Sequence, residues 1–520
     1  MDLTTITNQL SGYVKNINLN SQQQQKIGVV TAATLVSAYA LYKQFSKEKD
    51  YGCPTVPYTD SVKGSEEEYR KDPRAFVEKW TEKLGPVYRV HIFGRMHTVV
   101  SGKYAREVFM NDDFNFVTAT LKKFDVFALA GIFDSDTMNE VIRKTINQHL
   151  NPQLKEYTPR VVKNLAIGFN EILGDATEPK EIYHLYPLLN RMVTRASATI
   201  FVGEELCKDE SILQVMQGIT AKIGQYHPRV NPTWLTGFPS LMGIYFWYIG
   251  KFSTEIKNVR NTLKSALIPE IKKRKENAEK DPNWQRPTDM LQQLIDSDPS
   301  TPLNDTFYEK VLNFLLLLVF ASIHTTTENG IIVLYRLLQK PEIFDDLLKE
   351  QQQVLAENGL DPQGPSEDVF TCDVLKKMPK LDSVVRESLR LRNQFYELPH
   401  TNIRNRNVVL SNGVSIPPDM DVLINVWHNH HEGEETDLGE FKPFRYVDTR
   451  YPASKVADNY LVFGEGKHAC PGRWLAIQEI KTVVAMMVRE YKLTAPEGVN
   501  YPMTGSGLPS GKVIIEKRTI

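Results

Sequence analysis

Apolar residues recur at helical spacing along most of the chain after about residue 58. Residues 328–358 predict two helices separated by Pro341, because a proline removes a backbone donor and interrupts a helix. Further helices are predicted at 375–392 and 472–491. The thirteen residues 311–323 are nearly all apolar, which is too short to span a bilayer and is typical of a helix buried in a large core.

Stretches with the character of strands are short and few. One lies at residues 87–100, and a second at 407–423 contains Asn412-Gly413, a strong hairpin turn signal. A third lies near the carboxyl end, around residues 511–517. These patterns predict a mainly α fold with small peripheral β-sheets, in a single large domain over residues 58–520.

The amino-terminal part of the chain has a different pattern. Residues 1–25 are polar, and residues 26–45 contain a mostly apolar run of sixteen residues, slightly under the ~20 that usually span a bilayer. Lysines and aromatic residues at its borders favour a single transmembrane anchor, with an amphipathic soluble helix as the alternative. Residues 46–57 contain two prolines and predict a stiff hinge. More lysines follow the apolar run than precede it, so we expect the large domain to be cytoplasmic.

Composition excludes several classes of protein. Hydrophobic residues make up 41% and charged residues 24%, and glycine and proline are 29 each, which excludes collagen-like chains and wholesale disorder. With 62 basic and 63 acidic residues, the chain offers no global electrostatic argument for binding nucleic acid. Four widely spread cysteines suit a reducing compartment: Cys53, Cys207, Cys372 and Cys470.

The strongest chemical signal is the segment 463–472, FGEGKHACPG, which directly precedes a predicted helix. Its glycines let the backbone turn tightly and approach a flat ligand. Cys470 lies where free N–H groups and the helix dipole favour a thiolate, while Phe463 can cover one face of a macrocycle and His468 can donate to a negatively charged edge. This set suits a thiolate ligand to haem iron. The alternative is a buried structural cysteine in a glycine turn.

The segment matches the pattern F-x-x-G-x-(R/H)-x-C-x-G and resembles the signature of the cytochrome P450 superfamily. Two further motifs follow the order of that family: Glu387 with Arg390, one helical turn apart, and the segment 441–446, FKPFRY, which contains Arg445. The resemblance implies that these three side chains form a buried charge network that holds the fold around the haem. Their role would be structural rather than catalytic.

The apolar segment ending in Thr327 resembles the family's long helix across the distal haem face. There the family pattern (A/G)Gx(D/E)T aligns with Ala321-Ser-Ile-His324-Thr325. Thr325 keeps the hydroxyl that the resemblance assigns to oxygen and proton handling. His324 replaces the acid, and a histidine can move protons near neutral pH. An interior histidine with ordinary hydrogen bonds is the alternative for His324.

The resemblance implies haem b as the cofactor, bound by residues of the segment around Cys470 and by groups that neutralise its propionates. The carried-over candidates for cofactor binding are Phe463, Gly464, His468, Cys470, Gly472, His400 and Arg143. The family's W-x-x-x-R helix is only half present, because Asn139 stands where tryptophan is usual. For Arg143, a solvated helix charge is therefore an equal alternative.

The substrate pocket is expected to have an apolar, aromatic lining, which favours a bulky lipophilic substrate. The candidates are Phe116, Phe124, Phe127, Ala321, Leu398 and Leu508, and plain core packing is the alternative for each. The segment 234–249 is unusually aromatic and predicts a membrane-dipping surface or a channel rim. A buried helix pair is the alternative there.

Taken together, the resemblance implies a membrane-anchored monooxygenase of the fungal microsomal type, which inserts one atom of O2 into a steroid or terpenoid. Electrons would come from NADPH through a separate flavoprotein reductase, with cytochrome b5 as a second candidate partner, and we expect an endoplasmic reticulum location. The alternatives are a haem-thiolate isomerase, dehydratase or peroxygenase, a fatty-acid hydroxylase, a haem sensor or carrier, and a purely structural helical protein.

Overall fold

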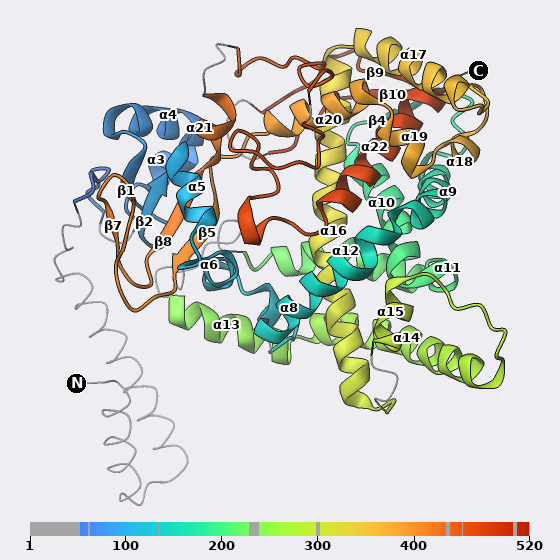
Figure 1. The fold of residues 1–520 in the computed structure, drawn as a ribbon, viewed down its shortest axis with the longest axis horizontal. Coiled ribbons are helices and arrows are strands. Elements are labelled where there is room, and N and C mark those ends of the chain that lie inside the picture. The colour runs from blue at the N-terminus through green and yellow to red at the C-terminus, as the bar shows by residue number, and fades with distance from the viewer. Residues whose placement is uncertain are drawn as a thin grey trace, which may run out of the picture. The chain divides into compact units, whose positions relative to one another are not determined.

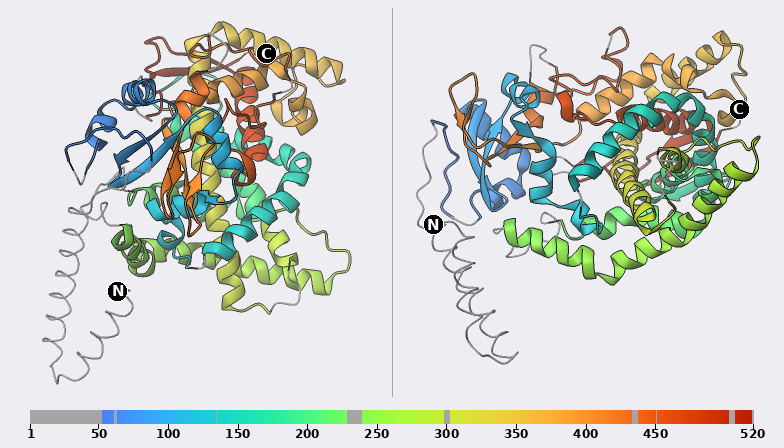
Figure 2. Two further views of the ribbon diagram at one scale, coloured as in Figure 1. Left: turned by 60° about the vertical axis from the view of Figure 1, so that its left-hand side comes forward. Right: turned by 60° about the horizontal axis from the view of Figure 1, so that its bottom comes forward.

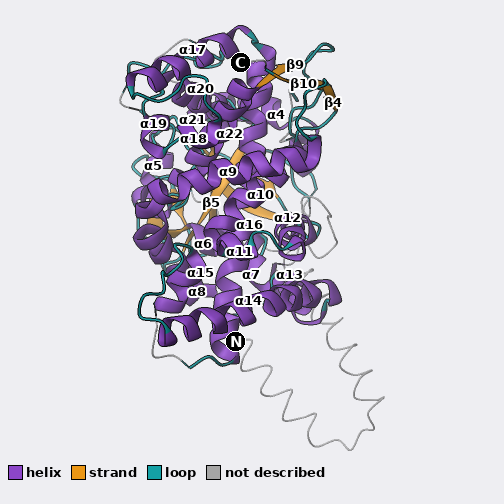
Figure 3. Ribbon diagram, turned by 90° about the vertical axis from the view of Figure 1, so that its right-hand side faces the viewer, coloured by secondary structure: helices purple, strands orange, loops and turns teal. Residues whose placement is uncertain are grey.

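The structure is a computed structural model that describes residues 52–60, 63–133, 135–227, 239–297, 302–432, 437–449, 451–502 and 507–518. The predicted anchor and the first part of the predicted hinge lie outside the described residues. The description below concerns the unit from Cys53 onward. Helices dominate this unit and the strands form small sheets, which confirms the predicted fold class (Figure 3).

The centre of the unit is α16, which runs from Asp305 to Gln339 (Figure 1). The Asn304 side chain accepts a hydrogen bond from the Phe307 N–H and so begins the helix, and Lys340 and Pro341 end it. The helices that pack most extensively against it are α10 (Tyr186–Phe201), α12 (Glu210–Gly224), α14 (Thr254–Lys280), α20 (Pro379–Arg390) and α22 (Arg473–Glu490).

In the described part of the chain, α16 is the one helix long and apolar enough to cross a membrane. In the most apolar 18-residue stretch of this helix, 61% is buried, because the neighbouring helices cover it. The segments 311–327 and 328–339, which the sequence analysis treated separately, both lie within α16 and so form one helix of the core. Pro341 separates it from α17 (Glu342–Glu357), as predicted.

The largest sheet has five strands in the order β1-β2-β8-β5-β3. β1 (Val87–Ile92) and β2 (Arg95–Val100) form the predicted antiparallel hairpin, and β8 (Asp421–Asn425) joins β2 in parallel. β5 (Tyr396–Asn402) and β3 (Phe114–Asn115) complete it. In Figure 2 the blue strands from the early chain lie beside the orange strands from the late chain.

Two smaller sheets complete the strands of the described residues. The predicted Asn412-Gly413 turn joins β6 (Val408–Val409) to β7 (Ser415–Ile416). The strand predicted near the carboxyl end is β10 (Val513–Lys517), which lies between β4 (Lys180–Ile182) and β9 (Tyr491–Thr494).

The remaining helices surround this framework and are mostly short. They are α3 (Glu66–Lys71), α4 (Pro73–Leu84), α5 (Lys103–Met110), α6 (Phe116–Lys123), α7 (Val126–Leu129), α8 (Ser135–Thr145), α9 (Leu154–Leu173), α11 (Gly203–Leu206), α13 (Pro239–Phe252), α15 (Met290–Asp296), α18 (Ser366–Val369), α19 (Cys372–Lys376) and α21 (Val426–His431). The helix predicted at 375–392 is divided into α19 and α20, because Pro379 begins a new helix there.

Candidate functional site

The cysteine-containing loop is a tight turn closed on itself. The Cys470 N–H donates to the Phe463 carbonyl at 2.8 Å. Gly464 and Gly466 have φ angles of +66° and +64°, a conformation that favours glycine. A Cβ atom on Gly466 would lie 2.6 Å from the Phe109 carbonyl oxygen, so glycine is also the residue that fits sterically.

Cys470 lies just before α22, which begins at Arg473 with Gly472 as its cap. Burial raises the pKa of the Cys470 thiol, while hydrogen bonds from the N–H groups of Gly472 and Arg473 act in the opposite direction. A metal cation bound to the sulfur would complete the stabilisation of a thiolate. Among the described residues, no group of three or more His, Cys, Asp or Glu side chains could hold a metal ion.

Two imidazoles lie together beside this loop, that of the buried His400 and that of the half-buried His468. The ring centroids of His400, on β5, and His468 lie 5.8 Å apart. The Nδ1 atom of His400 donates to the Leu398 carbonyl at 2.8 Å. Within the described residues, both Nε2 atoms are buried without a hydrogen-bond partner. Such orphaned nitrogen atoms suit an anionic ligand.

The charges around the two imidazoles also favour an anionic ligand. Burial lowers the pKa of His400 to about 4, and burial also lowers the pKa of His468. The positive charges of Lys467 and Arg143 lower the pKa of His468 further, which brings Arg143 of α8 close to this group. A carboxylate at this position would meet the positive charges of Lys467 and Arg143, and its own charge would favour the imidazolium form of His400, in which Nε2 also donates.

The three charge-network candidates lie together. Arg390 contacts both oxygens of Glu387 at 2.8 Å, and the Arg445 Nε lies 3.1 Å from the same carboxylate. Asp437, which our sequence analysis missed, accepts from Arg445 at 2.6 Å. Hydrogen bonds from Lys442 and Arg445 lower the pKa of Asp437 to about 2. The Glu387 and Arg390 side chains are fully buried, so this is an internal network between α20 and the segment before the cysteine loop.

The middle of α16 has one exposed strip. Ala321 and Thr325 are exposed, whereas the adjacent Ile323, Thr326 and Thr327 are buried. The Thr325 hydroxyl donates to the Ala321 carbonyl at 2.7 Å. Since α16 packs against α22, which follows Cys470, the strip belongs to the central part of the unit (Figure 1).

His324 has hydrogen bonds through both ring nitrogens. Its Nδ1 lies 2.8 Å from the Tyr186 hydroxyl, and its Nε2 lies 3.0 Å from the Glu328 carboxylate. The sequence analysis identified neither partner. Tyr186 is far from His324 in the chain, and Glu328 lies one helical turn after His324 without belonging to a recognised motif.

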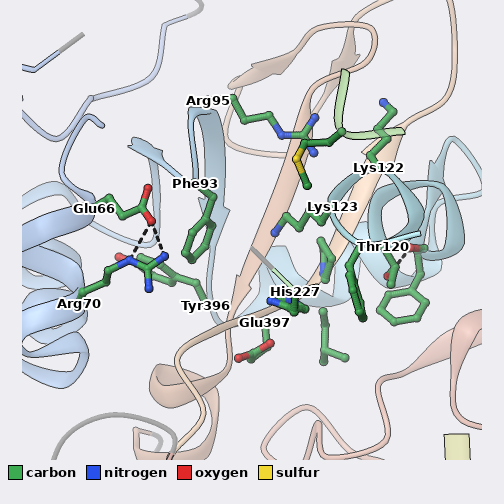
Figure 4. A pocket seen from close by; sticks show the side chains of 15 residues that line it. Glu66, Arg70, Phe93, Arg95, Thr120, Lys122, Lys123, His227, Tyr396 and Glu397 are labelled. Carbon is green, nitrogen blue, oxygen red and sulfur yellow. Dashed lines mark hydrogen bonds and ion pairs between the residues drawn. The ribbon is translucent and has the colours of Figure 1, made fainter. Parts of the chain in front are cut away.

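An apolar cavity of about 270 Å³ lies between α6 and the largest sheet (Figure 4). Three of the predicted pocket residues line it, namely Phe116, Phe124 and Leu398. The lining does not include Cys470, Thr325 or the predicted Ala321. The Phe116 ring lies 5.7 Å from His400 and 6.5 Å from His468, so one aromatic side chain connects the cavity with the imidazole pair.

The other two predicted pocket residues lie elsewhere. Phe127 is buried in the main hydrophobic core. Leu508 lines a second, very small cavity with Tyr501 and Arg392. Other lining residues of the large cavity were missed, because only the tertiary fold brings them together: Phe93, Arg95, Lys123, His227, Met242 and Tyr396.

These observations fit a haem group. The site offers one sulfur ligand, a glycine turn that permits close approach, and orphaned donors for a carboxylate edge. The opposing helix offers an exposed strip with a hydroxyl group.

Comparisons with known proteins agree with this geometry. The family model described as Cytochrome P450 matches residues 54–518. Cytochrome P450 monooxygenase AN1598 of Emericella nidulans is 26% identical over 401 residues, 72% of this chain and 70% of the relative. Cytochrome P450 monooxygenase 151 of Postia placenta is 24% identical over 489 residues, 89% of this chain and 92% of the relative. The solved structure of retinoic acid-bound cyanobacterial CYP120A1 is similar in fold, with a TM-score of 0.63, 21% identity, and coverage of 90% of this chain and 100% of that one.

Proposed function

This chain belongs to the cytochrome P450 family and is a monooxygenase, and from that premise we propose that it hydroxylates a lipophilic substrate of the steroid or terpenoid type. In the proposed reaction the substrate RH, O2, two electrons and two protons give ROH and water. The electrons come from NADPH through a separate flavoprotein reductase, with cytochrome b5 as a second donor.

In this proposal the thiolate of Cys470 would hold haem b through its iron. A thiolate-bound haem iron activates O2, because electron donation from the sulfur favours O–O cleavage. Gly464 and Gly472 allow the backbone to approach the macrocycle, and Phe463, 9% exposed, keeps water from the sulfur. His400, His468 and Arg143 bind the propionates. The unpartnered Nε2 atoms of the two histidines support this assignment.

On the distal side we assign Thr325 and His324 to proton handling. Thr325 is exposed, whereas its neighbours Ile323 and Thr326 on the same helix are buried. His324 has two hydrogen-bond partners, which hold its ring in one orientation.

The proposed substrate class rests on the large cavity. Its aromatic and aliphatic lining favours a rigid hydrocarbon body, and Phe116 and Phe124 provide flat surfaces for it. Charged side chains line it as well, and two ion pairs lie among them: Glu66 with Arg70 (Figure 4), and Arg95 with Asp421. A fatty acid is the competing substrate class.

We also propose a location on the cytoplasmic face of the endoplasmic reticulum membrane, with residues 26–45 as the anchor. Support in the described residues comes from α13, whose exposed large apolar side chains are Ile244, Trp247, Tyr248 and Phe252. Such a face suits the interfacial region of a bilayer. The reductase is proposed to bind near Lys376, Lys377, Lys380 and Lys467. Two of these lysines are paired with acids, Lys380 with Asp346 and Lys467 with Asp112, so the net attraction is modest.

One observation carries the proposal: a half-buried cysteine in a glycine turn, beside two imidazoles whose Nε2 atoms are buried without partners within the described residues. The test is reconstitution of the full chain with NADPH and a reductase, with steroids, diterpenes and fatty acids as candidate substrates. We expect a steroid or diterpene to shift the haem spectrum and to gain one ¹⁸O atom from ¹⁸O2. Product that forms without O2 or without reductase would instead support an isomerase or peroxygenase.

A further inference from the structure

The hydrogen bonds around His324 extend well beyond the helix that carries it. From α10, the Tyr186 hydroxyl meets Nδ1 at 2.8 Å, and Asn190 donates to the same hydroxyl oxygen at 3.4 Å. From the next turn of α16, Glu328 meets Nε2 at 3.0 Å. Arg392, just after α20, contacts the other oxygen of Glu328 at 2.7 Å. The contacts therefore join α10, α16 and the segment that follows α20.

Helix geometry places this network at the edge of the exposed strip. At 100° per residue, Ala321, His324, Thr325 and Glu328 occupy one arc of α16 about 100° wide. The side chains of His324 and Glu328 are 36% and 19% exposed, while residues on the opposite side of the helix, such as Ile323, are buried. The network therefore lies on the same face of α16 as the strip that carries the Thr325 hydroxyl.

The charges favour a fixed arrangement. Burial acts to raise the pKa of the Glu328 carboxyl, but the hydrogen bond from His324 and the charge of Arg392 outweigh it and hold the pKa below its usual value. Glu328 is therefore a carboxylate near neutral pH. Burial and the charge of Glu328 raise the pKa of Tyr186, so its hydroxyl keeps its proton.

We propose that Tyr186, His324 and Glu328 form the proton-supply network of this monooxygenase, with Glu328 and Tyr186 as positioning residues for His324. The inference rests on the proposed function, in which two protons are consumed with two electrons for each substrate hydroxylated. Glu328 accepts the Nε2–H bond and so fixes the tautomer, which leaves Nδ1 to take up and release a proton. Tyr186 donates to Nδ1 when the ring is neutral and accepts from it when the ring is charged.

The groups that face the imidazole in the described structure are few. They are the Glu328 carboxylate, the Arg392 guanidinium behind it, the Tyr186 hydroxyl, and the neutral amides of Asn190 and Asn329, the latter bonded to Arg392 at 2.8 Å. Of these, the carboxylate is the group that stabilises an imidazolium. Glu328→Gln therefore removes the one carboxylate among these groups that contacts the ring.

The test measures the C–O stretching frequency of the carbon monoxide complex between pH 5 and 8, in the reduced full-length protein. We expect the pH dependence of this frequency to differ between the wild type and Glu328→Gln, and to be absent in His324→Gln. Tyr186→Phe should broaden the C–O band, because the ring loses its fixed orientation. In turnover with NADPH, both Glu328→Gln and Tyr186→Phe should give several-fold less product per NADPH, and Glu328→Asp should recover part of it.

Matched controls lie on the same helix. Glu309→Gln removes a carboxylate paired with Arg260 and Lys264, and Tyr308→Phe removes a hydroxyl that has no partner within the described residues. Both should behave as the wild type. If Glu328→Gln fails to fold because Arg392 is left unpaired, the double variant Glu328→Gln/Arg392→Gln restores neutrality and should show the same difference from the wild type.

An unchanged pH dependence and unchanged coupling in Glu328→Gln, with the thiolate-type spectrum retained, would overturn the proton network alone. If the wild-type protein itself shows no thiolate-type spectrum, the proposed function is overturned. The two failures are therefore distinguishable in one set of samples.

Discussion

At the scale of single residues, Glu479 of α22 has an unusual environment. It is fully buried; one oxygen accepts from the Ser197 hydroxyl at 3.0 Å, and the other has no partner within the described residues. Burial raises its pKa from 4.5 to about 8. The carboxyl is therefore expected to be protonated in the folded protein at neutral pH.

This environment predicts a pH-dependent loss of stability. Between pH 4.5 and 8 the unfolded chain releases the Glu479 proton while the folded chain retains it, so the free energy of unfolding falls as pH rises. Glu479→Gln should remove this dependence and be more stable than the wild type by about 4 kcal/mol at pH 8, but by only ~1 kcal/mol at pH 5. Urea unfolding at both pH values checks it, with the exposed Glu497→Gln as control. Parallel pH dependence in the wild type and Glu479→Gln would contradict the assignment.

Thr325 gives a second prediction at this scale. Thr325→Ala removes the exposed hydroxyl of the strip and should lower the product formed per NADPH oxidised severalfold, with more reduced oxygen released instead. Ser322→Ala is the matched control, because its hydroxyl also donates to a carbonyl one turn earlier, at 2.7 Å. Equal coupling in the two variants would mean that the strip hydroxyl is not used.

Single residues also show where prediction from the sequence stops. Glu387, Arg390 and Arg445 were identified from local motifs, and they contact one another in the structure. Their partner Asp437 and the His324 partners Tyr186 and Glu328 carry no such signal. Acids and tyrosines are common, and only the packing of separate helices brings these to the site.

At the scale of secondary-structure elements, the charge network joins α20 to the segment before the cysteine loop. Arg445→Ala leaves part of a buried carboxylate unpaired and should lower the free energy of unfolding by about 3–5 kcal/mol. Lys442→Ala, which removes an exposed partner of the same Asp437, should cost at most ~1 kcal/mol. Urea unfolding of the full chain compares them. Equal costs would mean that the network is not structural.

The sequence predicted which segments form helices more reliably than the residues at which helices end or the elements that pair or pack together. The expected helix at 472–491 is Arg473–Glu490, because Pro471 and Gly472 mark its start in the sequence. The segments 311–327 and 328–339 form one helix, since an apolar run followed by amphipathic spacing carries no stop signal. The pairing of β2 with β8 joins distant parts of the chain, and no local pattern specifies it.

At the scale of the whole molecule, the proposed membrane contact can be measured through Trp247, whose side chain is on the exposed face of α13. In vesicles with brominated lipids, the full chain should show quenched tryptophan fluorescence, and Trp247→Phe should lose much of that quenching. Trp474→Phe, at an exposed position on α22, should not. Quenching that is unaffected by Trp247→Phe would remove α13 from the proposed membrane surface.

The whole account depends on the bond between one sulfur atom and the haem iron. The most direct measurement is the carbon monoxide difference spectrum of the reduced full-length protein and of four single variants, Cys53→Ala, Cys207→Ala, Cys372→Ala and Cys470→Ala. We predict a thiolate-type spectrum in the wild type and the first three variants, and its complete loss in Cys470→Ala. A thiolate-type spectrum that persists in Cys470→Ala would contradict the account.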